Sequence, residues 1–212
     1  MVDYECLTAK GGKRLVGFGR YAGIVGTYNS FIAYGRRTGS YELKAAHLCA
    51  DRKEMESELP KIQLPRNYKI ALTGLGRVAG GAIEVLIKIG VKQVDSNAFL
   101  TEDFQEPVFT QLSVKDYFKL KTGGEFERQE AYQHPERFDS DFMKYAAVAD
   151  MYIPCHYWDA EGPIIFTEEE LKSPEFNIEV IGDISCDIAG PIPSTIRPST
   201  VADPIYEVNK AS

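Results

Sequence analysis

Two glycines and an alanine near the middle of the chain have the spacing of a phosphate-binding turn. Gly74, Gly76 and Ala79 match the pattern G-x-G-x-x-G/A. In that pattern the first glycine makes a tight turn, the second lets the backbone approach a pyrophosphate, and the third position keeps helix and strand close. The first turn of a following helix offers free N–H groups and a positive dipole end to the phosphates. These residues therefore predict a dinucleotide site.

The surrounding residues have the patterns of the elements that such a turn requires. The apolar run Ile70–Leu72 predicts a buried strand, and the residues after the glycines follow a helical period to Ile89. Asp95 lies 21 positions after Gly74, close to the spacing at which an acid binds the adenosine ribose. The alternative is an ordinary glycine-rich turn, but strand, helix and acid together favour the cofactor.

Strands and helices alternate along the rest of the chain. Further strands are expected at 91–95, 108–112, 151–156 and 178–184, and helices at 41–50, 51–59, 139–149 and 167–171. Segment 113–138 is expected to be an excursion outside the sheet, and the tail 189–212 to be irregular. This alternation predicts an α/β fold with a doubly wound parallel sheet, the Rossmann dinucleotide-binding fold.

The N-terminal part has a different pattern. Segments 2–7 and 14–18 predict a hairpin around the turn 10–13. Segment 19–34 predicts a helix, followed by a polar break at 35–40. Its small residues share one face, at Gly19, Gly23, Gly26, Ser30 and Ala33. We expect this face to pack against protein, either the last segment of the chain or a second copy in a homo-oligomer. The expected domains are 1–37, hairpin and connecting helix, and 38–212, the nucleotide-binding domain.

Composition excludes several function classes. The 212 residues are 44% hydrophobic and carry a net charge of −7, which supports a sizeable core and argues against a nucleic-acid surface. No apolar run approaches the ~20 residues of a membrane span, and the first residues have no signal-peptide pattern. Four cysteines, at 6, 49, 155 and 186, form no C-x-x-C pair. We therefore expect a cytoplasmic protein with reduced thiols, no metal site and no membrane partner.

In a doubly wound sheet, ligands lie at the carboxyl ends of the strands. This rule selects 74–78, 95, 155–158 and 185–187 as site segments. His156 is placed there, as a contact of the nicotinamide ribose or as a hydrogen-bonded core group. Asp183 is interpreted as structural, whereas Asp187 has a loop position from which it can face the cleft. Cys155 and Cys186 are interpreted as small buried residues, and Arg197 as a solvated loop cation.

Four segments carry a resemblance to a known family: Arg14–Gly23, Gly76–Ala82, Tyr152–Trp158 and Asp183–Ile188. They resemble the lysine-forming saccharopine dehydrogenases, which belong with alanine dehydrogenase and the soluble part of pyridine nucleotide transhydrogenase. The resemblance implies an NAD-dependent amino-acid oxidoreductase that transfers a hydride at a C–N bond. An alanine dehydrogenase-like enzyme and a non-catalytic, transhydrogenase-like module are the alternatives.

The resemblance also assigns residues. Gly76, Arg77 and Val78 match the family's pyrophosphate loop, with Gly74 before them, and Asp95 matches its ribose-binding acid. Asp187 resembles the aspartate that lies close to the nicotinamide, which makes it the candidate catalytic residue. Two departures are Thr73, where these enzymes often have glycine, and the insert 113–138.

The resemblance covers the middle and later part of such an enzyme. The family's N-terminal substrate region, with its catalytic lysine and histidine, has no counterpart here. We therefore expect a nucleotide-binding portion that meets its amino-acid substrate through that missing region and is inactive alone. Asp95 predicts NAD(H) over NADP(H), because Ser96 and Asn97 supply no cation for a 2′-phosphate.

Overall fold

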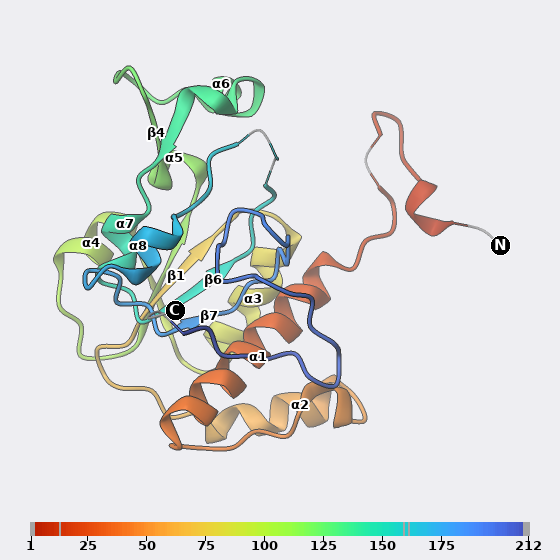
Figure 1. The fold of residues 1–212 in the computed structure, drawn as a ribbon. Coiled ribbons are helices and arrows are strands. Elements are labelled where there is room, and N and C mark those ends of the chain that lie inside the picture. The colour runs from red at the N-terminus through yellow and green to blue at the C-terminus, as the bar shows by residue number, and fades with distance from the viewer. Residues whose placement is uncertain (1–2, 13, 159, 161, 210–212) are drawn as a thin grey trace.

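The computed structural model describes residues 3–12, 14–158, 160 and 162–209. A parallel sheet of five strands in the order β2-β3-β1-β6-β7 forms its centre (Figure 1). The strands are β1 (Lys69–Thr73), β2 (Lys92–Val94), β3 (Val108–Leu112), β6 (Met151–Pro154) and β7 (Val180–Ile181). The expected doubly wound α/β fold is confirmed, with β1 in the middle of the sheet; β7 is shorter than the expected strand 178–184.

Helices cover both faces of the sheet. On one face lie α1 (Gly19–Thr38), α2 (Arg52–Glu58, continued by the 3-10 turn Leu59–Lys61) and α3 (Arg77–Lys88), which share a core with the buried Ile70 and Leu72 of β1. On the other lie α4 (Ser96–Thr101), α7 (Met143–Ala146) and α8 (Glu168–Lys172), packed around Tyr152 of β6 (Figure 1). Each face buries its own hydrophobic cluster, as a doubly wound sheet requires.

The glycine face of α1 packs against α3. A Cβ on Gly23 would lie 1.9 Å from the carbonyl oxygen of Val78, and a Cβ on Gly81 would lie 1.9 Å from that of Arg20. Farther along α1, a Cβ on Gly26 would meet the Ile184 side chain at 2.5 Å. The expectation of a protein contact is confirmed, but the main partner is α3 rather than the last segment or a second copy.

Around the end of α1 the expected helix boundaries were wrong. The helix runs through the expected break at Gly35 and ends at Thr38, with Gly39 in the left-handed conformation (φ 67°). Consequently the expected domain boundary at residue 37 falls inside its last turn. Segment 41–50 is not an α-helix but irregular, with one 3-10 turn at Ala46–Leu48. The segment packs against α1, where the Tyr28 hydroxyl donates to the Lys44 carbonyl at 2.7 Å.

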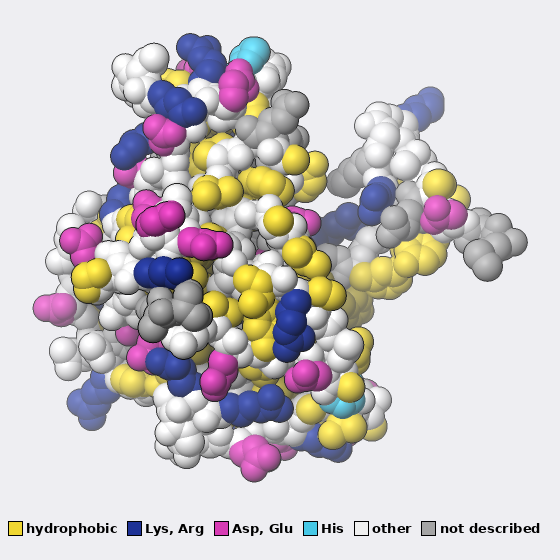
Figure 2. All heavy atoms as spheres, in the orientation of Figure 1, with side chains coloured by type: hydrophobic (Ala, Val, Ile, Leu, Met, Phe, Trp, Pro, Cys, Tyr) yellow, Lys and Arg dark blue, Asp and Glu magenta, His cyan; other side chains and the backbone are white. Residues whose placement is uncertain are grey.

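The N-terminal arm is only partly the expected hairpin. A bridge joins Thr8 and Arg14, but Tyr4–Cys6 forms a 3-10 turn instead of a strand; Val2 and Lys13 lie outside the described residues. The arm projects from the body and carries exposed hydrophobic side chains, Leu15 and Phe18 among them (Figures 1 and 2). Without a body to pack on, its strands lack the neighbouring surface that stabilises a two-stranded ribbon.

The 113–138 excursion lies outside the main sheet but has its own structure. It contains α5 (Val114–Tyr117), β4 (Phe118–Leu120), α6 (Arg128–Gln133) and the 3-10 turn Pro135–Arg137. Strand β4 pairs antiparallel with β5 (Phe138–Ser140). The helix expected over 139–149 is therefore wrong in its first half, since Asp139 and Ser140 belong to β5 and only α7 remains.

In the described part of the chain, no helix has the length and apolar character needed to cross a membrane.

Candidate functional site

The glycine turn lies at the carboxyl end of the central strand. Gly74 has φ +104°, a conformation that favours glycine. A Cβ there would lie 2.6 Å from the carbonyl oxygen of Cys155, and the Gly74 N–H donates to the Leu112 carbonyl at 3.0 Å. Gly74 is therefore hydrogen-bonded to the end of β3 and closely packed against the backbone that follows β6.

Gly76 has a different environment. It is the N-cap of α3, in extended backbone (φ −89°, ψ −168°) and without a side-chain cap hydrogen bond. A Cβ built on it would find no atom within 4 Å. Neither backbone conformation nor packing therefore requires glycine here, and the space beside the uncapped helix end fits the close approach of a phosphate. Ala79, at the third motif position, is fully buried.

Arg77 and Val78 begin α3. Val78 packs against α1, where a Cβ on Gly19 would meet its side chain at 3.2 Å. Arg77 is exposed, and its guanidinium lies beside Gly17 of the N-terminal arm, 2.8 Å from where a Cβ would be. The structure thus places one cation in the first turn of α3, with its guanidinium beside the N-terminal arm.

Asp95 lies farther from the turn than its spacing suggests. It follows β2, the edge strand, and β3 lies between β2 and β1. Its Oδ1 accepts hydrogen bonds at 3.0 Å from the N–H groups of Asn97 and Ala98, which caps α4. Its spacing from Gly74 matches the motif, but β2 lies at the edge of the sheet. The strand next to β1 is β3, which comes later in the chain.

The strand beside β1 contributes residues that the sequence reading missed. The Gln111 side chain donates to the Gly74 carbonyl at 2.9 Å. After β3, the Ser113 N–H and hydroxyl donate to the Asp116 carboxylate at 2.8 and 2.7 Å, in the capping box of α5. The serine three residues before an acid was the sequence signal for this cap.

The structure brings His156 and Asp187 to one open pocket of about 490 Å³, although they follow different strands. Its other lining residues are Tyr157, Trp158, Ala160 and Ser185. The loop that carries Asp187 is strained, since the non-glycine residues Cys186 and Ala189 both have φ 55°. Such strain concentrates at functional sites.

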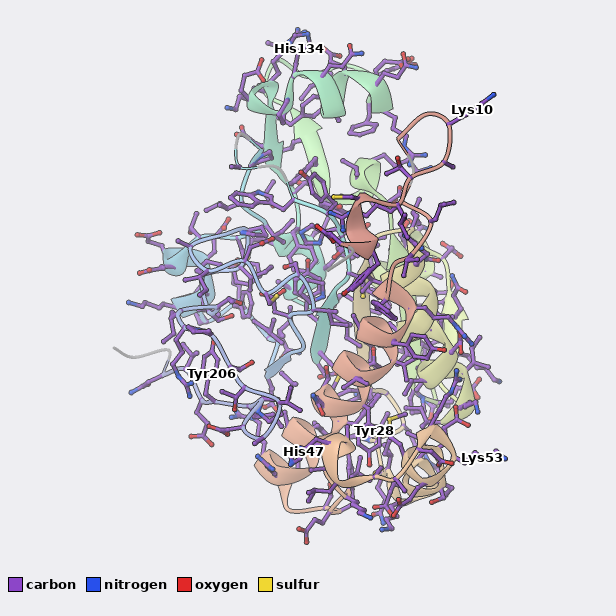
Figure 3. All side chains as sticks on the ribbon, turned by 90° about the vertical axis from the view of Figure 1, so that its right-hand side faces the viewer. Lys10, Tyr28, His47, Lys53, His134 and Tyr206 are labelled. Atoms are coloured by element: carbon purple, nitrogen blue, oxygen red, sulfur yellow. The ribbon has the colours of Figure 1, made fainter. Side chains whose placement is uncertain are left out.

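His156 is hydrogen-bonded below this pocket. Its Nδ1 lies 2.7 Å from the Thr73 hydroxyl, which lies 3.0 Å from the hydroxyl of the fully buried Tyr152. Burial lowers the pKa of His156 to about 4, against a smaller opposite effect of Asp183. The imidazole is therefore neutral at pH 7. Figure 3 shows the other two histidines, His47 and His134, at opposite ends of the molecule.

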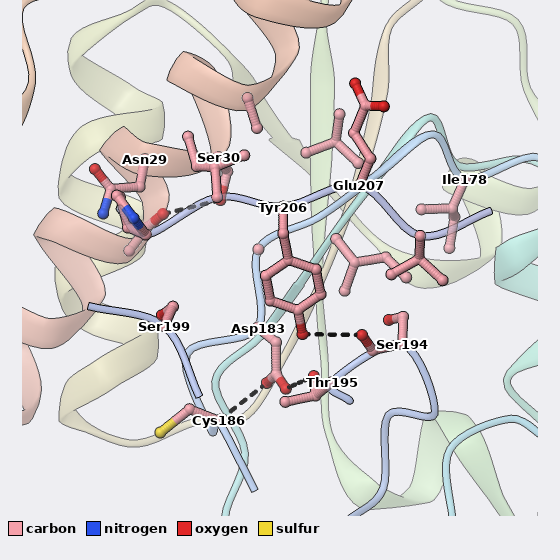
Figure 4. A pocket seen from close by; sticks show the side chains of 18 of the residues that line it. Asn29, Ser30, Ile178, Asp183, Cys186, Ser194, Thr195, Ser199, Tyr206 and Glu207 are labelled. Atoms are coloured by element: carbon pink, nitrogen blue, oxygen red, sulfur yellow. Dashed lines mark hydrogen bonds between the residues drawn. The ribbon is translucent and has the colours of Figure 1, made fainter. Parts of the chain in front are cut away.

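Asp183 has the structural role expected of it. Its Oδ1 accepts from the Ser185 hydroxyl at 2.6 Å. Figure 4 shows two further bonds, in which Oδ1 accepts from the Cys186 N–H at 3.3 Å and Oδ2 accepts from the Thr195 hydroxyl. These bonds tie the end of β7 to the tail. They also form one wall of a second cavity, of about 390 Å³, between α1, β7 and the tail.

Three further expectations can be compared with the structure. Cys155 is buried, as expected, and burial raises the pKa of its thiol to about 12. Cys186 is exposed, which contradicts the expectation, because it lies in the strained loop rather than in a strand. Arg197 is exposed, as expected, and its guanidinium lies 4.4 Å from the centre of the Tyr206 ring, farther along the same tail.

The comparisons with known proteins find no family model that matches the chain. The α-aminoadipic semialdehyde synthase of Arabidopsis thaliana is 23% identical over 100% of this chain and 23% of its own length. The mitochondrial α-aminoadipic semialdehyde synthases of Mus musculus and Rattus norvegicus are each 26% identical over 96% of this chain and 26% of their own. The chain thus spans about a quarter of the length of the curated relatives it matches. Over nearly all its residues, it is similar to a segment of an α-aminoadipic semialdehyde synthase.

Proposed function

We propose that this chain is the dinucleotide-binding part of an amino-acid oxidoreductase and that it binds NAD(H). The observation that carries the proposal is the turn from Gly74 to Val78 at the carboxyl end of β1, with open space over Gly76 and an uncapped helix behind it. The pyrophosphate lies there, on the first N–H groups of α3 and within reach of Arg77.

The adenosine ribose lies beyond β3, on the side of the sheet edge. Asp116 and Asp95 follow β3 and β2, so carboxylates flank this side. Because β3 is the neighbour of β1, Asp116 with Ser113 stands nearer than Asp95 to the place of a ribose. A 2′-phosphate would meet this negative charge, which supports NAD(H) over NADP(H). The side chain of Lys115 is a cation that would favour NADP(H) instead.

The nicotinamide half lies on the other side of β1, toward the pocket of His156 and Asp187. Bound NAD(H) supplies the hydride transfer, and the protein supplies position and charge. Asp187 is exposed at the pocket and is the carboxylate that faces this half. The neutral imidazole of His156 provides a hydrogen-bonding group without placing a second positive charge beside an oxidised nicotinamide.

The substrate class follows from the relatives. The motifs resemble the lysine-forming saccharopine dehydrogenases, and the relatives are named α-aminoadipic semialdehyde synthases. Their named product is lysine with its terminal amine-bearing carbon oxidised to an aldehyde. We therefore place the hydride transfer at a C–N bond of a lysine-derived secondary amine such as saccharopine, with the substrate held by parts of the protein other than this chain.

Titration with NADH tests the proposal. Trp158, the single tryptophan of the chain, lines the pocket of His156, so its fluorescence should fall on binding. NAD(H) is expected to bind more tightly than NADP(H), and Lys115→Ala should not weaken NAD(H) binding. Binding of neither dinucleotide would contradict the cofactor site, and tighter binding of NADP(H) would contradict the preference.

A turnover assay separates binding from catalysis. The 212-residue chain is expected to bind NADH yet to show no change in NADH absorbance with saccharopine, lysine or alanine. Hydride transfer requires a substrate held over the nicotinamide and a proton-transfer group within about 3 Å of it. Robust turnover would show that His156 or Asp187 does more than position the cofactor.

A further inference from the structure

Thr73 is a polar residue in a strand that is otherwise apolar after Lys69, and its hydroxyl is buried at the end of that strand. It is also a departure from the resembling family, which often has glycine there. The hydroxyl joins two residues far along the chain, Tyr152 at 3.0 Å and His156 at 2.7 Å. The three side chains form one hydrogen-bonded chain from the core to the pocket.

The direction of this chain follows from its hydrogens. A threonine hydroxyl has one hydrogen to donate, and so has a tyrosine hydroxyl. If Thr73 donated to Tyr152, the tyrosine hydrogen would have no acceptor among the described residues. If Nδ1 of His156 and the Tyr152 hydroxyl both donated to Thr73, the threonine hydrogen would have no acceptor. When Tyr152 donates to Thr73 and Thr73 donates to Nδ1, both hydroxyl hydrogens are used and only the imidazole N–H lacks a partner. The other two arrangements leave both a hydroxyl hydrogen and the bare Nε2 unpaired in the described part of the chain.

This direction decides the state of the imidazole. A neutral imidazole whose Nδ1 accepts carries its hydrogen on Nε2. Nε2 is shielded from solvent and has no hydrogen-bond partner in the described part of the chain. A buried donor without an acceptor is unfavourable, and the same ring lines the pocket. The orphan donor therefore belongs to a ring at the edge of the pocket, although solvent does not reach it.

We propose that Thr73 and Tyr152 are positioning residues that hold His156 as the Nε2–H tautomer, which donates to an oxygen of the nicotinamide nucleoside. The inference rests on the proposed function, since it needs the dinucleotide in this cleft. Because solvent does not reach Nε2, the oxygen meets it only after neighbouring side chains shift. The spectrum of the bound protein is therefore the decisive observation.

Nitrogen NMR of histidine-labelled protein tests the tautomer. The chain has three histidines, so the variant His156→Gln identifies the signal and His47 and His134 serve as references. His156 is expected to be neutral with its hydrogen on Nε2 from pH 8 to about pH 5. Addition of NADH should shift the Nε2 signal, whereas AMP should not. A shift with ADP-ribose would place the acceptor on the ribose, and a shift with NADH alone would place it on the nicotinamide.

Variants of Thr73 test the positioning role. Thr73→Val keeps the shape but removes the hydroxyl, and it should release the fixed tautomer and weaken NADH binding by about threefold to tenfold. Thr73→Ser keeps the hydroxyl and should restore both. Tyr152→Phe should leave the threonine free to reverse and mix the tautomers. If Thr73→Val fails to fold, the parent spectrum and Thr73→Ser still decide.

The outcomes separate the two proposals. NADH that binds without moving the Nε2 signal overturns this inference and leaves the cofactor site standing. A hydrogen on Nδ1 in the parent protein, or a Thr73→Val variant with parent tautomer and affinity, also overturns it. Absence of any dinucleotide binding removes the proposed function and this inference with it.

Discussion

Two pairs of glycines in this chain have opposite surroundings. Gly23 and Gly81 face backbone, so that a Cβ on either would lie 1.9 Å from a carbonyl oxygen of the neighbouring helix. Gly76 and Gly80 face open space, and a Cβ on either would have no described atom within 4 Å. The first pair is explained by the contact between α1 and α3, whereas the second has no neighbour among the described residues that requires glycine.

This contrast separates a glycine required by packing from one that serves a ligand. Gly80 and Gly81 are adjacent in the same helix, yet only Gly81 faces α1. Gly76 lies at the helix start in a backbone conformation that other residues adopt. The contact of α1 with α3 is thus complete in itself, while the turn before α3 leaves a surface that a phosphate would cover.

The largest effect is expected at the packed pair. Gly81→Ala should destabilise the protein by about 1–3 kcal/mol, because the added methyl group overlaps the Arg20 carbonyl. Gly80→Ala, its matched control, should be neutral or stabilise by up to about 1 kcal/mol, the helix propensity difference. Chemical denaturation measures both. Equal stabilities would mean that the helices can move apart at no cost. Gly23→Leu should be at least as damaging as Gly81→Ala.

Substitution at the open turn should separate binding from stability. Gly76→Ala is expected to keep the free energy of unfolding within about 0.5 kcal/mol and to weaken NADH binding by about tenfold or more, since the methyl group occupies the phosphate's space. Fluorescence titration and thermal unfolding read the two effects. Gly74→Ala should instead lower stability, because its positive φ and the Cys155 carbonyl exclude a side chain. Unchanged affinity in Gly76→Ala would contradict the site.

The acids beyond the turn provide a third comparison. Asp95→Ala should cost about 0.5–2 kcal/mol by removing the cap of α4, whereas Asp95→Asn keeps a capping side chain and should cost little. If Asp116 stands nearer the ribose, Asp116→Asn should narrow the preference for NAD(H) over NADP(H) more than Asp95→Asn does. The reverse ranking, measured by titration of both nucleotides, would restore Asp95 as the ribose-binding acid.

The smallest effect is expected at the surface of the α1–α3 contact. Glu84 of α3 accepts hydrogen bonds from Arg20 and from Arg52, which lower its pKa to about 2. A lowered pKa in the folded state means that this interaction stabilises the protein above the unfolded-state pKa and is lost as pH falls toward 2. Both partners are partly exposed, so the gain is small. The melting temperature of the parent should exceed that of Glu84→Gln at pH 7, and the two should be equal near pH 2. A difference in melting temperature that stays constant with pH would contradict a stabilising ion pair.

Local patterns predicted the elements whose residues determine them locally. Segment 108–112 is a strand because its apolar, β-forming residues are buried, and Thr167 caps α8 through the capping box with Glu170. Segment 41–50 failed because its side chains are used against α1, with Tyr41 donating to the Phe31 carbonyl. The helical pattern of residues 41–50 could not predict that this segment packs against α1.

The glycine turn with its helix and the small-residue face of α1 could be predicted from the sequence, because each rests on residues close together in the chain. The parallel α/β class followed from the alternation of such elements. The order of the strands, in contrast, is set by the assembled sheet, which removes Asp95 from beside β1 and puts Ser113 and Asp116 there. It also joined Thr73 to His156, 83 positions away. Spacing along a chain measures neither which strand lies next to another nor which hydroxyl a buried imidazole meets, since both depend on how the sheet is assembled.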